Sequence, residues 1–189
     1  MQTSRMDIEM ATDAVEDLLA ALDIDTTQPG LAETPARYVK FLVEALSRPK
    51  VDFKTFEEPG ADEMIVQGPI PFTSLCEHHT LPFLGHAWVG YLPSENRVLG
   101  LSKLARCVKH YAAGLNTQER ITAQVALRLH AELKCAGVGV MLRAEHLCMR
   151  CRGVRVDGVK TISSKLLGEF KTNPSTKAEF FRSIELLPG

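Results

Sequence analysis

The sequence predicts an α+β fold, in which helices accompany a largely antiparallel sheet. Apolar residues recur at helical spacing near both ends of the chain and in its middle, whereas short β-prone segments lie between these regions. The resulting order is two helices, strands, two helices, strands and a last helix. Because strands and helices are grouped rather than alternating one by one, the order favours an antiparallel sheet over a parallel one.

The first third of the chain is predicted to form a helix pair followed by a loop. Segment 7–22 carries valine and leucine at helical spacing. For the second helix we expect Thr34 as the cap and Pro35 as the first helical residue, with the Arg-Pro pair 48–49 as its end. Residues 50–63 are polar and acidic, which is typical of a linker or long loop.

The middle of the chain predicts two strands and a helix. Segments 64–72 and 86–92 are short and β-prone, and we expect the stretch 76–85 between them to be a loop. Apolar residues over 101–112 form a helical stripe, which Gly114 is predicted to break.

The last part of the chain predicts a helix, a strand, a hairpin and a final helix. The helix spans 117–134 and is stopped by Gly137. Alternating apolar residues predict a strand over 138–148. The dipeptide 157–158, Asp-Gly, is typical of a two-residue hairpin turn, and the last helix follows 173–175.

Composition places the chain among globular proteins. Of its 189 residues, 45% are hydrophobic and 24% charged, which is too apolar for a disordered chain. No apolar run approaches the roughly 18 residues that cross a bilayer. Residues 1–7 lack the apolar core of a signal peptide, so membrane and secreted classes are not expected.

The charges are unevenly distributed along the chain. Residues 1–65 carry 14 acidic and 6 basic side chains, whereas residues 66–189 carry 9 acidic and 16 basic ones. A basic C-terminal part would suit an anionic ligand. An acidic helix pair beside a basic sheet explains the same balance without any ligand.

Two short segments with cysteine are the strongest signals of chemistry. The chain has five cysteines and no secretory signal, which predicts reduced thiols and a cytoplasmic location. Cys76 and His79 form a C-x-x-H pair, whose thiolate and imidazole could hold zinc. Cys148 would complete the site, with or without Cys151. Taken alone, the C-x-x-H pair is weak evidence, and we would then favour a polar surface loop for His78 and His79.

Whether Cys151 is a ligand decides between two kinds of site. Four ligands would close a structural zinc site, whereas Cys76, His79 and Cys148 alone would leave one position open for catalysis. If the predicted strand continues past Cys148, positions 148 and 151 point to opposite faces, which favours three ligands. We therefore expect Cys151 to be a small buried apolar residue. The same expectation holds for the cysteines of the helical segments, Cys107 and Cys135.

An open zinc position predicts hydrolysis, because the ion lowers the pKa of bound water to about 7. His78 follows the first cysteine by two residues, and His146 shares a strand face with Cys148. Both imidazoles are therefore candidates for proton transfer beside the metal.

Two predicted helix starts carry candidates for binding an anionic nucleotide. Ser102, Lys103 and Arg106 could bind phosphate at a helix N-terminus. Without the cysteine and histidine segments, we would favour a solvated helix face with a good cap. Glu119, next to Gln118, could accept two hydrogen bonds from a guanine edge. The alternative for Glu119 is simple helix capping.

Three arginines follow Cys148: Arg150, Arg152 and Arg155. On a strand, Arg150 and Arg152 share a face with Cys148, so at least one guanidinium could reach a polyphosphate beside the metal. The alternative, which we favour for Arg155, is a basic exposed strand.

Together these segments resemble the GTP cyclohydrolase I family from about residue 10 to the end of the chain. Each stretch is short, but their occurrence in this order is highly specific. The matching stretches are Glu33-Thr34-Pro35-Ala36-Arg37, Cys76-Glu77-His78-His79, Gly100-Leu101-Ser102-Lys103-Leu104, Thr117-Gln118-Glu119-Arg120, His146-Leu147-Cys148, Arg152-Gly153 and Gly168-Glu169-Phe170.

The resemblance implies zinc-dependent hydrolytic opening of the imidazole ring of GTP, release of formate and rearrangement to 7,8-dihydroneopterin triphosphate. It implies zinc bound by Cys76, His79 and Cys148. The residues that it implies in catalysis are His78, His146 and Ser102. Those that it implies in substrate binding are Glu119, the Gln118 backbone, Lys103, Arg106, Arg152 and Arg37.

The resemblance also implies a tunnelling fold. In that fold an antiparallel sheet carries helices on one side, an N-terminal helix pair precedes it, and the sheets join into a barrel in a pentamer. The family forms a homodecamer of two pentamers with sites at subunit boundaries. We expect residues 1–63 to form the N-terminal helical segment and linker and residues 64–189 the catalytic domain, with GTP rather than nucleic acid or a membrane as its partner.

Two other functions are considered. The first is a non-catalytic zinc module, closed by Cys151, that binds nucleic acid or another anionic partner. The aromatic content of only 6% and the lack of an aromatic-basic platform weigh against it. The second is a ring-opening enzyme that acts on a modified purine. Glu119 weighs against this function, because a carboxylate at that position favours guanine.

Overall fold

The computed structural model describes residues 6–188, so residues 1–5 and 189 lie outside the description. The expected lack of a signal peptide falls mostly on these undescribed residues. The chain divides into two compact units, Met1–Ser47 and Arg48–Gly189. None of the helices within 6–188 is both long and apolar enough to cross a bilayer.

The first unit is a helix pair, as the sequence predicts. Helix α1 (Ile8–Ala21) packs against α2 (Thr34–Leu46). Asp7 caps α1 by accepting a hydrogen bond from the Met10 N–H at 3.0 Å. The expected cap of α2 was wrong, because Glu33 occupies the cap position and Thr34 is already helical. The chain enters α2 through a turn, in which the Thr34 N–H donates to the Leu31 carbonyl.

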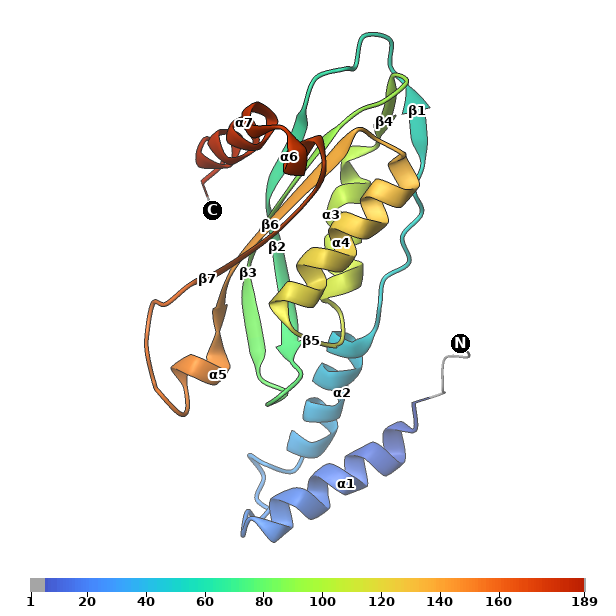
Figure 1. The fold of residues 1–189 in the computed structure, drawn as a ribbon. Coiled ribbons are helices and arrows are strands. Elements are labelled where there is room, and N and C mark those ends of the chain that lie inside the picture. Colours follow the sequence, from blue (N-terminus) through green and yellow to red (C-terminus); the bar gives the residue numbers. More distant parts are fainter. Residues whose placement is uncertain (1–5, 189) are drawn as a thin grey trace. The chain divides into compact units, whose positions relative to one another are not determined.

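The second unit is built on a five-stranded sheet in the order β5-β2-β3-β6-β7 (Figure 1). All neighbours are antiparallel except the short parallel pair of β2 and β5. The strands are β2 (Ile65–Cys76), β3 (Pro82–Leu92), β5 (Leu115–Asn116), β6 (Gly137–His146) and β7 (Thr161–Gly168). A separate pair joins β1 (Thr55–Glu57) to β4 (Arg97–Leu99), so a strand lies inside the predicted loop 50–63.

Helices cover both faces of this sheet rather than one, which corrects the expectation (Figure 1). On one face lie α3 (Leu101–Ala112) and α4 (Gln118–Leu133). On the other lie α6 (Glu169–Thr172) and α7 (Pro174–Glu185), and α5 (Leu147–Arg150) lies between β6 and β7 in the chain.

Strand alternation explains why two layers of helices are needed. In β3, Ala87 and Val89 belong to the core under α3 and α4, whereas Trp88 belongs to a second core with Phe170 and Phe180. At Gly139 an added Cβ would lie 2.5 Å from the Phe170 ring, so the second core requires glycine there. Apolar side chains on both faces therefore have to be covered.

Several predicted boundaries were wrong around the cysteine segments. Strands β2 and β3 are longer than expected, so the predicted loop 76–85 shrinks to 77–81. Strand β6 ends at His146, and Gly137 begins it rather than ending α4. The Asp-Gly pair 157–158 lies in the long connection before β7 and not in a two-residue hairpin.

Candidate metal centre and its surroundings

Cys76 is the last residue of β2 and is buried. A tight turn follows it: the Cys76 N–H donates to the Leu81 carbonyl at 2.8 Å, and the Thr80 N–H donates to the Cys76 carbonyl at 2.8 Å. This turn returns the chain to the start of β3. It places His79 beside the strand end, with the His79 Nδ1 3.8 Å from the Cys76 Sγ.

Cys148 completes a three-residue group with Cys76 and His79. One ligand atom from each of the three residues lies within 4.8 Å of the others. Cys148 reaches this place from α5 and not from a strand, because β6 ends two residues earlier. The spacing of the cysteine segments therefore predicted the group correctly, whereas the strand geometry assumed for Cys148 was wrong.

The electrostatics of the two thiols fit a bound cation. Burial raises the pKa of the Cys148 thiol, and the neighbouring Cys76 sulfur raises it further. A positive charge beside Cys148 would favour its thiolate and so oppose this rise. A thiolate–imidazole–thiolate set is also the donor chemistry that zinc prefers. The residues present thus fit a divalent metal.

Cys151 does not belong to this group. It is exposed, which corrects the expectation of a buried apolar residue, and its thiol donates to the Leu147 carbonyl at 2.8 Å. The argument from opposite strand faces fails as well, since Cys148 lies within the short helix α5 and Cys151 is the residue that ends it. Within residues 6–188, the group of ligand candidates consists of Cys76, His79 and Cys148. By contrast, Cys107 and Cys135 are buried as predicted.

His146 ends β6 and contacts two side chains. Its ring stacks on Phe83 with centroids 4.7 Å apart and planes within 3°. Its Nε2 lies 2.9 Å from the Oε1 atom of Gln118. Burial lowers the pKa of His146, and the carboxylate of Glu119 opposes that shift. The neutral imidazole is therefore favoured in the described chain.

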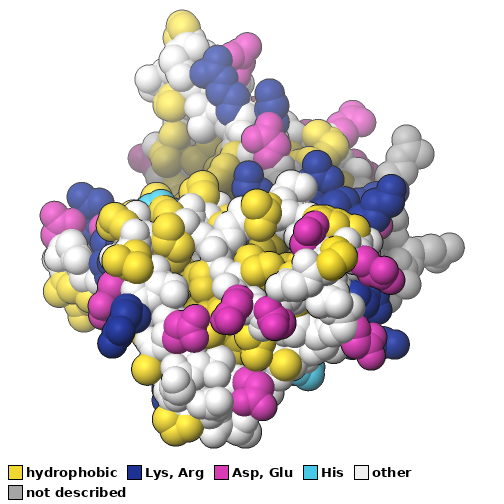
Figure 2. Space-filling model, turned by 90° about the horizontal axis from the view of Figure 1, so that it is seen from above, with side chains coloured by type: hydrophobic (Ala, Val, Ile, Leu, Met, Phe, Trp, Pro, Cys, Tyr) yellow, Lys and Arg dark blue, Asp and Glu magenta, His cyan; other side chains and the backbone are white. Residues whose placement is uncertain are grey.

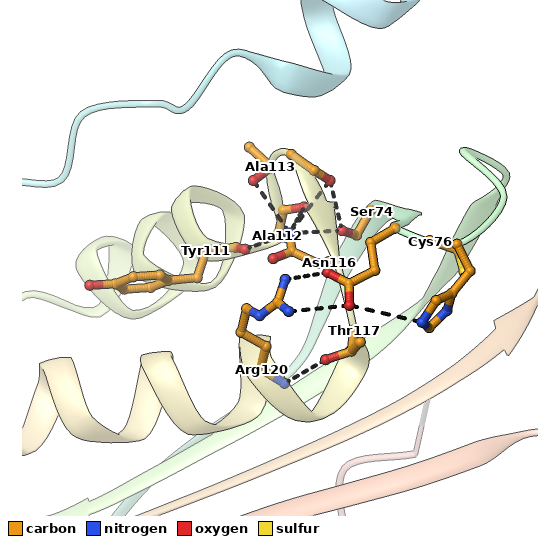
Figure 3. Close-up of polar contacts among 11 residues, drawn as sticks. Ser74, Cys76, Tyr111, Ala112, Ala113, Asn116, Thr117 and Arg120 are labelled. Atoms are coloured by element: carbon orange, nitrogen blue, oxygen red, sulfur yellow. Dashed lines mark hydrogen bonds and ion pairs between the residues drawn. The ribbon is translucent and has the colours of Figure 1, made fainter. Parts of the chain in front are cut away.

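His78 lies between Cys76 and an ion pair. Its Nδ1 is 3.6 Å from the Cys76 Sγ and its Nε2 is 3.9 Å from the Glu77 carboxylate. Glu77 also accepts from Arg120 in the first turn of α4, and this bond holds the pKa of the Glu77 carboxyl below its usual value (Figure 3). The turn that bears the histidines is thus tied to α4.

Comparison with known proteins assigns this arrangement to a family. The model of the family described as GTP cyclohydrolase I matches residues 11–185. The chain belongs to the GTP cyclohydrolase I family.

Relatives named GTP cyclohydrolase 1 cover nearly the whole chain. The one from Hydrogenobaculum sp. is 43% identical over 180 residues, which are 95% of this chain and 98% of that protein. The one from Nitrosospira multiformis is 45% identical over 174 residues, 89% and 91% of the two chains. The one from Thermoanaerobacter pseudethanolicus is 42% identical over 183 residues, 95% and 97%.

Among solved structures, the apo form of an archaeosine synthase QueF-Like covers 59% of this chain and 97% of its own. The identity is 15% and the TM-score 0.43, a likeness that is too low to carry an argument about fold or function. The GTP cyclohydrolase I family is metal-dependent, and the cysteine–histidine–cysteine group of this member can bind a metal.

The phosphate candidates of α3 lie away from the metal group. Helix α3 begins directly after β4, and its end leads into β5, which pairs with β2 at Cys76 (Figure 1). Its 12 residues span about 18 Å. Ser102 and Lys103 in its first turn are therefore separated from Cys76 by most of that length. Lys103 forms an ion pair with Asp52 at 3.3 Å, and Arg106 is exposed.

The arginine candidates have different partners. Arg152 donates to the Nε2 atom of His79, so it lies at the metal group. Arg150 pairs with Glu145 and Asp157, which corrects the expectation that it shares a strand face with Cys148. In the N-terminal unit, Arg37 pairs with Glu33 one helical turn away.

Charged side chains of both signs are mixed with apolar ones on the face shown in Figure 2. Basic side chains do not form a continuous field on that face.

Sequence reasoning missed two buried polar side chains, those of Gln118, the first residue of α4, and of Asn116, the last residue of β5. Gln118 was expected to act through its backbone, yet its side chain is only 1% exposed and contacts His146. Asn116 is 2% exposed, and its amide nitrogen lies near the carbonyls at the end of α3 (Figure 3). A polar residue on the apolar face of a predicted helix was a usable signal for Gln118, which lies in line with Ile121 and Val125.

Proposed function

We propose that this chain catalyses the GTP cyclohydrolase I reaction. GTP is opened hydrolytically at its imidazole ring, formate is released, and the remainder rearranges to 7,8-dihydroneopterin triphosphate. The observation that carries this proposal is the group of Cys76, His79 and Cys148 in a member of this family.

Cys76, His79 and Cys148 would hold zinc. A bound zinc ion supplies a Lewis acid that makes water a nucleophile near neutral pH. His146 and His78 would move protons to and from the purine, with His146 serving N7. Their places beside Gln118 and Cys76 support these roles.

Substrate binding would use charged side chains beside the metal centre and on helices further from it. Glu119 is exposed at the first turn of α4, where its carboxylate is free to meet the guanine edge together with the Gln118 backbone. Arg152 would contact the triphosphate. The further candidates are Ser102 near the sugar, and Lys103, Arg106 and Arg37 at the phosphates.

A homodecamer, built from two barrel-forming pentamers of the tunnelling fold, would complete each site. The length of α3 separates Ser102 and Lys103 from Cys76 of the same chain. A phosphate group bound beside that metal group would therefore meet the α3 side chains of a neighbouring copy. This separation supports the proposal that the sites lie at subunit boundaries.

Residues 64–189 would form the catalytic domain, and residues 1–63 the helical segment and linker. We further propose a cytoplasmic location, consistent with five free cysteines.

Incubation of the zinc-loaded protein with GTP tests the proposal. We expect a fluorescent pterin product and one formate released per GTP, and we expect the H146N variant to keep zinc and lose turnover. No formate from GTP in the wild-type protein would contradict the proposed function.

A further inference from the structure

The side-chain amide of Gln118 contacts three residues on two strands, β6 and β7. Its Nε2 lies 3.1 Å from the Leu142 carbonyl of β6, 3.1 Å from the Thr161 carbonyl of β7 and 3.0 Å from the Ser163 hydroxyl. Because carbonyl oxygens only accept hydrogen bonds, the NH₂ group must face them. The orientation of the amide is thereby fixed, and Oε1 points the other way.

The hydroxyls around Gln118 add to this rigidity. Thr122 donates to the Gln118 carbonyl at 2.7 Å, and its oxygen also lies 2.7 Å from the Ser163 hydroxyl. Gln118 and Thr122 are 1% and 2% exposed, so water does not compete for these groups. A buried amide with all its partners satisfied keeps one orientation.

The fixed amide decides which nitrogen of His146 carries a proton. Gln118 Oε1 lies 2.9 Å from His146 Nε2, and an amide oxygen can only accept. Nε2 must therefore be the protonated nitrogen, which leaves Nδ1 bare in the neutral ring. The stacked Phe83 ring restricts rotation of the imidazole about this bond.

We propose that Gln118 is a positioning residue that holds His146 as the Nε2–H tautomer, so that Nδ1 is the nitrogen that exchanges a proton with the substrate. The catalytic half of this inference rests on the proposed function. Since the Gln118 side chain is buried, its loss should slow turnover without weakening the binding of GTP.

Magic-angle-spinning NMR on the zinc-loaded, full-length protein labelled with ¹⁵N-histidine reads the tautomer directly. The His146 signals are identified by their loss in H146N. We expect the Nε2–H tautomer in the wild-type protein and in S163A, which removes one contact of the amide but leaves both carbonyls and Oε1 in place. In Q118M, which is similar in length but has no amide, we expect a mixture of tautomers.

Kinetics and metal content complete the test. We expect Q118M to lower kcat about 10- to 100-fold, as loss of a residue that orients another does. We expect its KM for GTP to stay within about threefold and its zinc content to remain that of the wild type. S163A should keep kcat within about threefold of the wild-type value.

A wild-type His146 protonated on Nδ1 would overturn the inference, and so would an unchanged kcat in a Q118M protein that folds. If Q118M does not fold, the wild-type tautomer decides alone. The proposed function is tested independently of the tautomer. It is contradicted if the wild-type protein releases no formate from GTP.

Discussion

The Glu77 carboxylate accepts two hydrogen bonds from the Arg120 guanidinium, with oxygen–nitrogen distances of 2.5 and 3.2 Å. Glu77 belongs to the turn that carries His78 and His79, and Arg120 to the turn of α4 that carries Glu119. The ion pair therefore links the proposed metal centre to the proposed guanine anchor. Bidentate pairing of this kind fixes direction as well as distance.

A mutant cycle on this pair is expected to show coupling. E77Q and R120M should each lower kcat/KM for GTP by roughly tenfold, and the double variant should lower it little further, because either change breaks the same link. Steady-state kinetics of the three variants measure this. E132Q, which breaks the surface pair of Arg128 and Glu132, serves as the control and should have no effect. Effects that multiply in the double variant would show that Glu77 and Arg120 act separately.

Removal of the Asn116 amide should destabilise the fold. Its nitrogen lies within hydrogen-bond distance of the Tyr111, Ala112 and Ala113 carbonyls and of the Ser74 hydroxyl (Figure 3). N116A leaves buried acceptors unpaired, which should cost about 1–3 kcal/mol in urea denaturation. N116D should be worse, since it places a carboxylate against carbonyls. A loss below about 0.5 kcal/mol in N116A would show that these acceptors find other partners.

The ion pairs of Glu145 should make stability depend on acid pH. The hydrogen bond from Lys160 and the charge of Arg150 hold the pKa of the Glu145 carboxyl below its usual 4.5. A carboxyl whose pKa is lowered by folding stabilises the fold above the unfolded value, and the contribution is lost as pH falls through the folded value. In the presence of a chelator, the gap in unfolding free energy between wild type and E145Q should be widest near neutral pH and narrow below 4.5. The same gap at about pH 3.5 and at neutral pH would contradict this.

The five cysteines should differ sharply toward iodoacetamide at about pH 8. Burial raises the pKa of Cys107 to about 12 and also raises that of Cys135, so both lack thiolate and should stay unmodified in the folded protein. Cys151 is exposed and should be alkylated first. Mass spectrometry of peptides gives the order in which the cysteines are alkylated. After removal of metal, we expect Cys76 and Cys148 to be alkylated as well. If Cys107 were alkylated as fast as Cys151, this would show that α3 exposes Cys107 to solvent and contradict the prediction.

The sequence predicts what depends on local periodicity. Both N-terminal helices, α3, α4 and α7 begin and end close to their expected residues, although α7 already begins at Pro174 rather than after residue 175. Strand ends were harder to place: β2 continues to Cys76 because pairing with β3 and β5 extends it, and that pairing is not local. The second layer of helices is needed because Trp88 and Met141 lie on the face of the sheet that α6 and α7 cover. From the sequence we predicted the strands but not which of their residues face each side.

The metal group was predictable from the C-x-x-H pair and a later cysteine, whereas its geometry was not. The strand argument that favoured three ligands was wrong, since Cys148 lies on α5 and Cys151 is exposed. The side-chain role of Gln118 depends on carbonyls of β6 and β7, which lie 24 and 43 residues away in the chain. Contacts at such separations leave no signature in one sequence.

X-ray absorption at the zinc edge of the metal-loaded protein tests the central claim, a site with three protein ligands and one open position. The account predicts two sulfur donors at about 2.3 Å and lighter donors in the remaining places, unchanged in C151A. A third sulfur in the wild-type protein that disappears in C151A would contradict it, because Cys151 would then close the site.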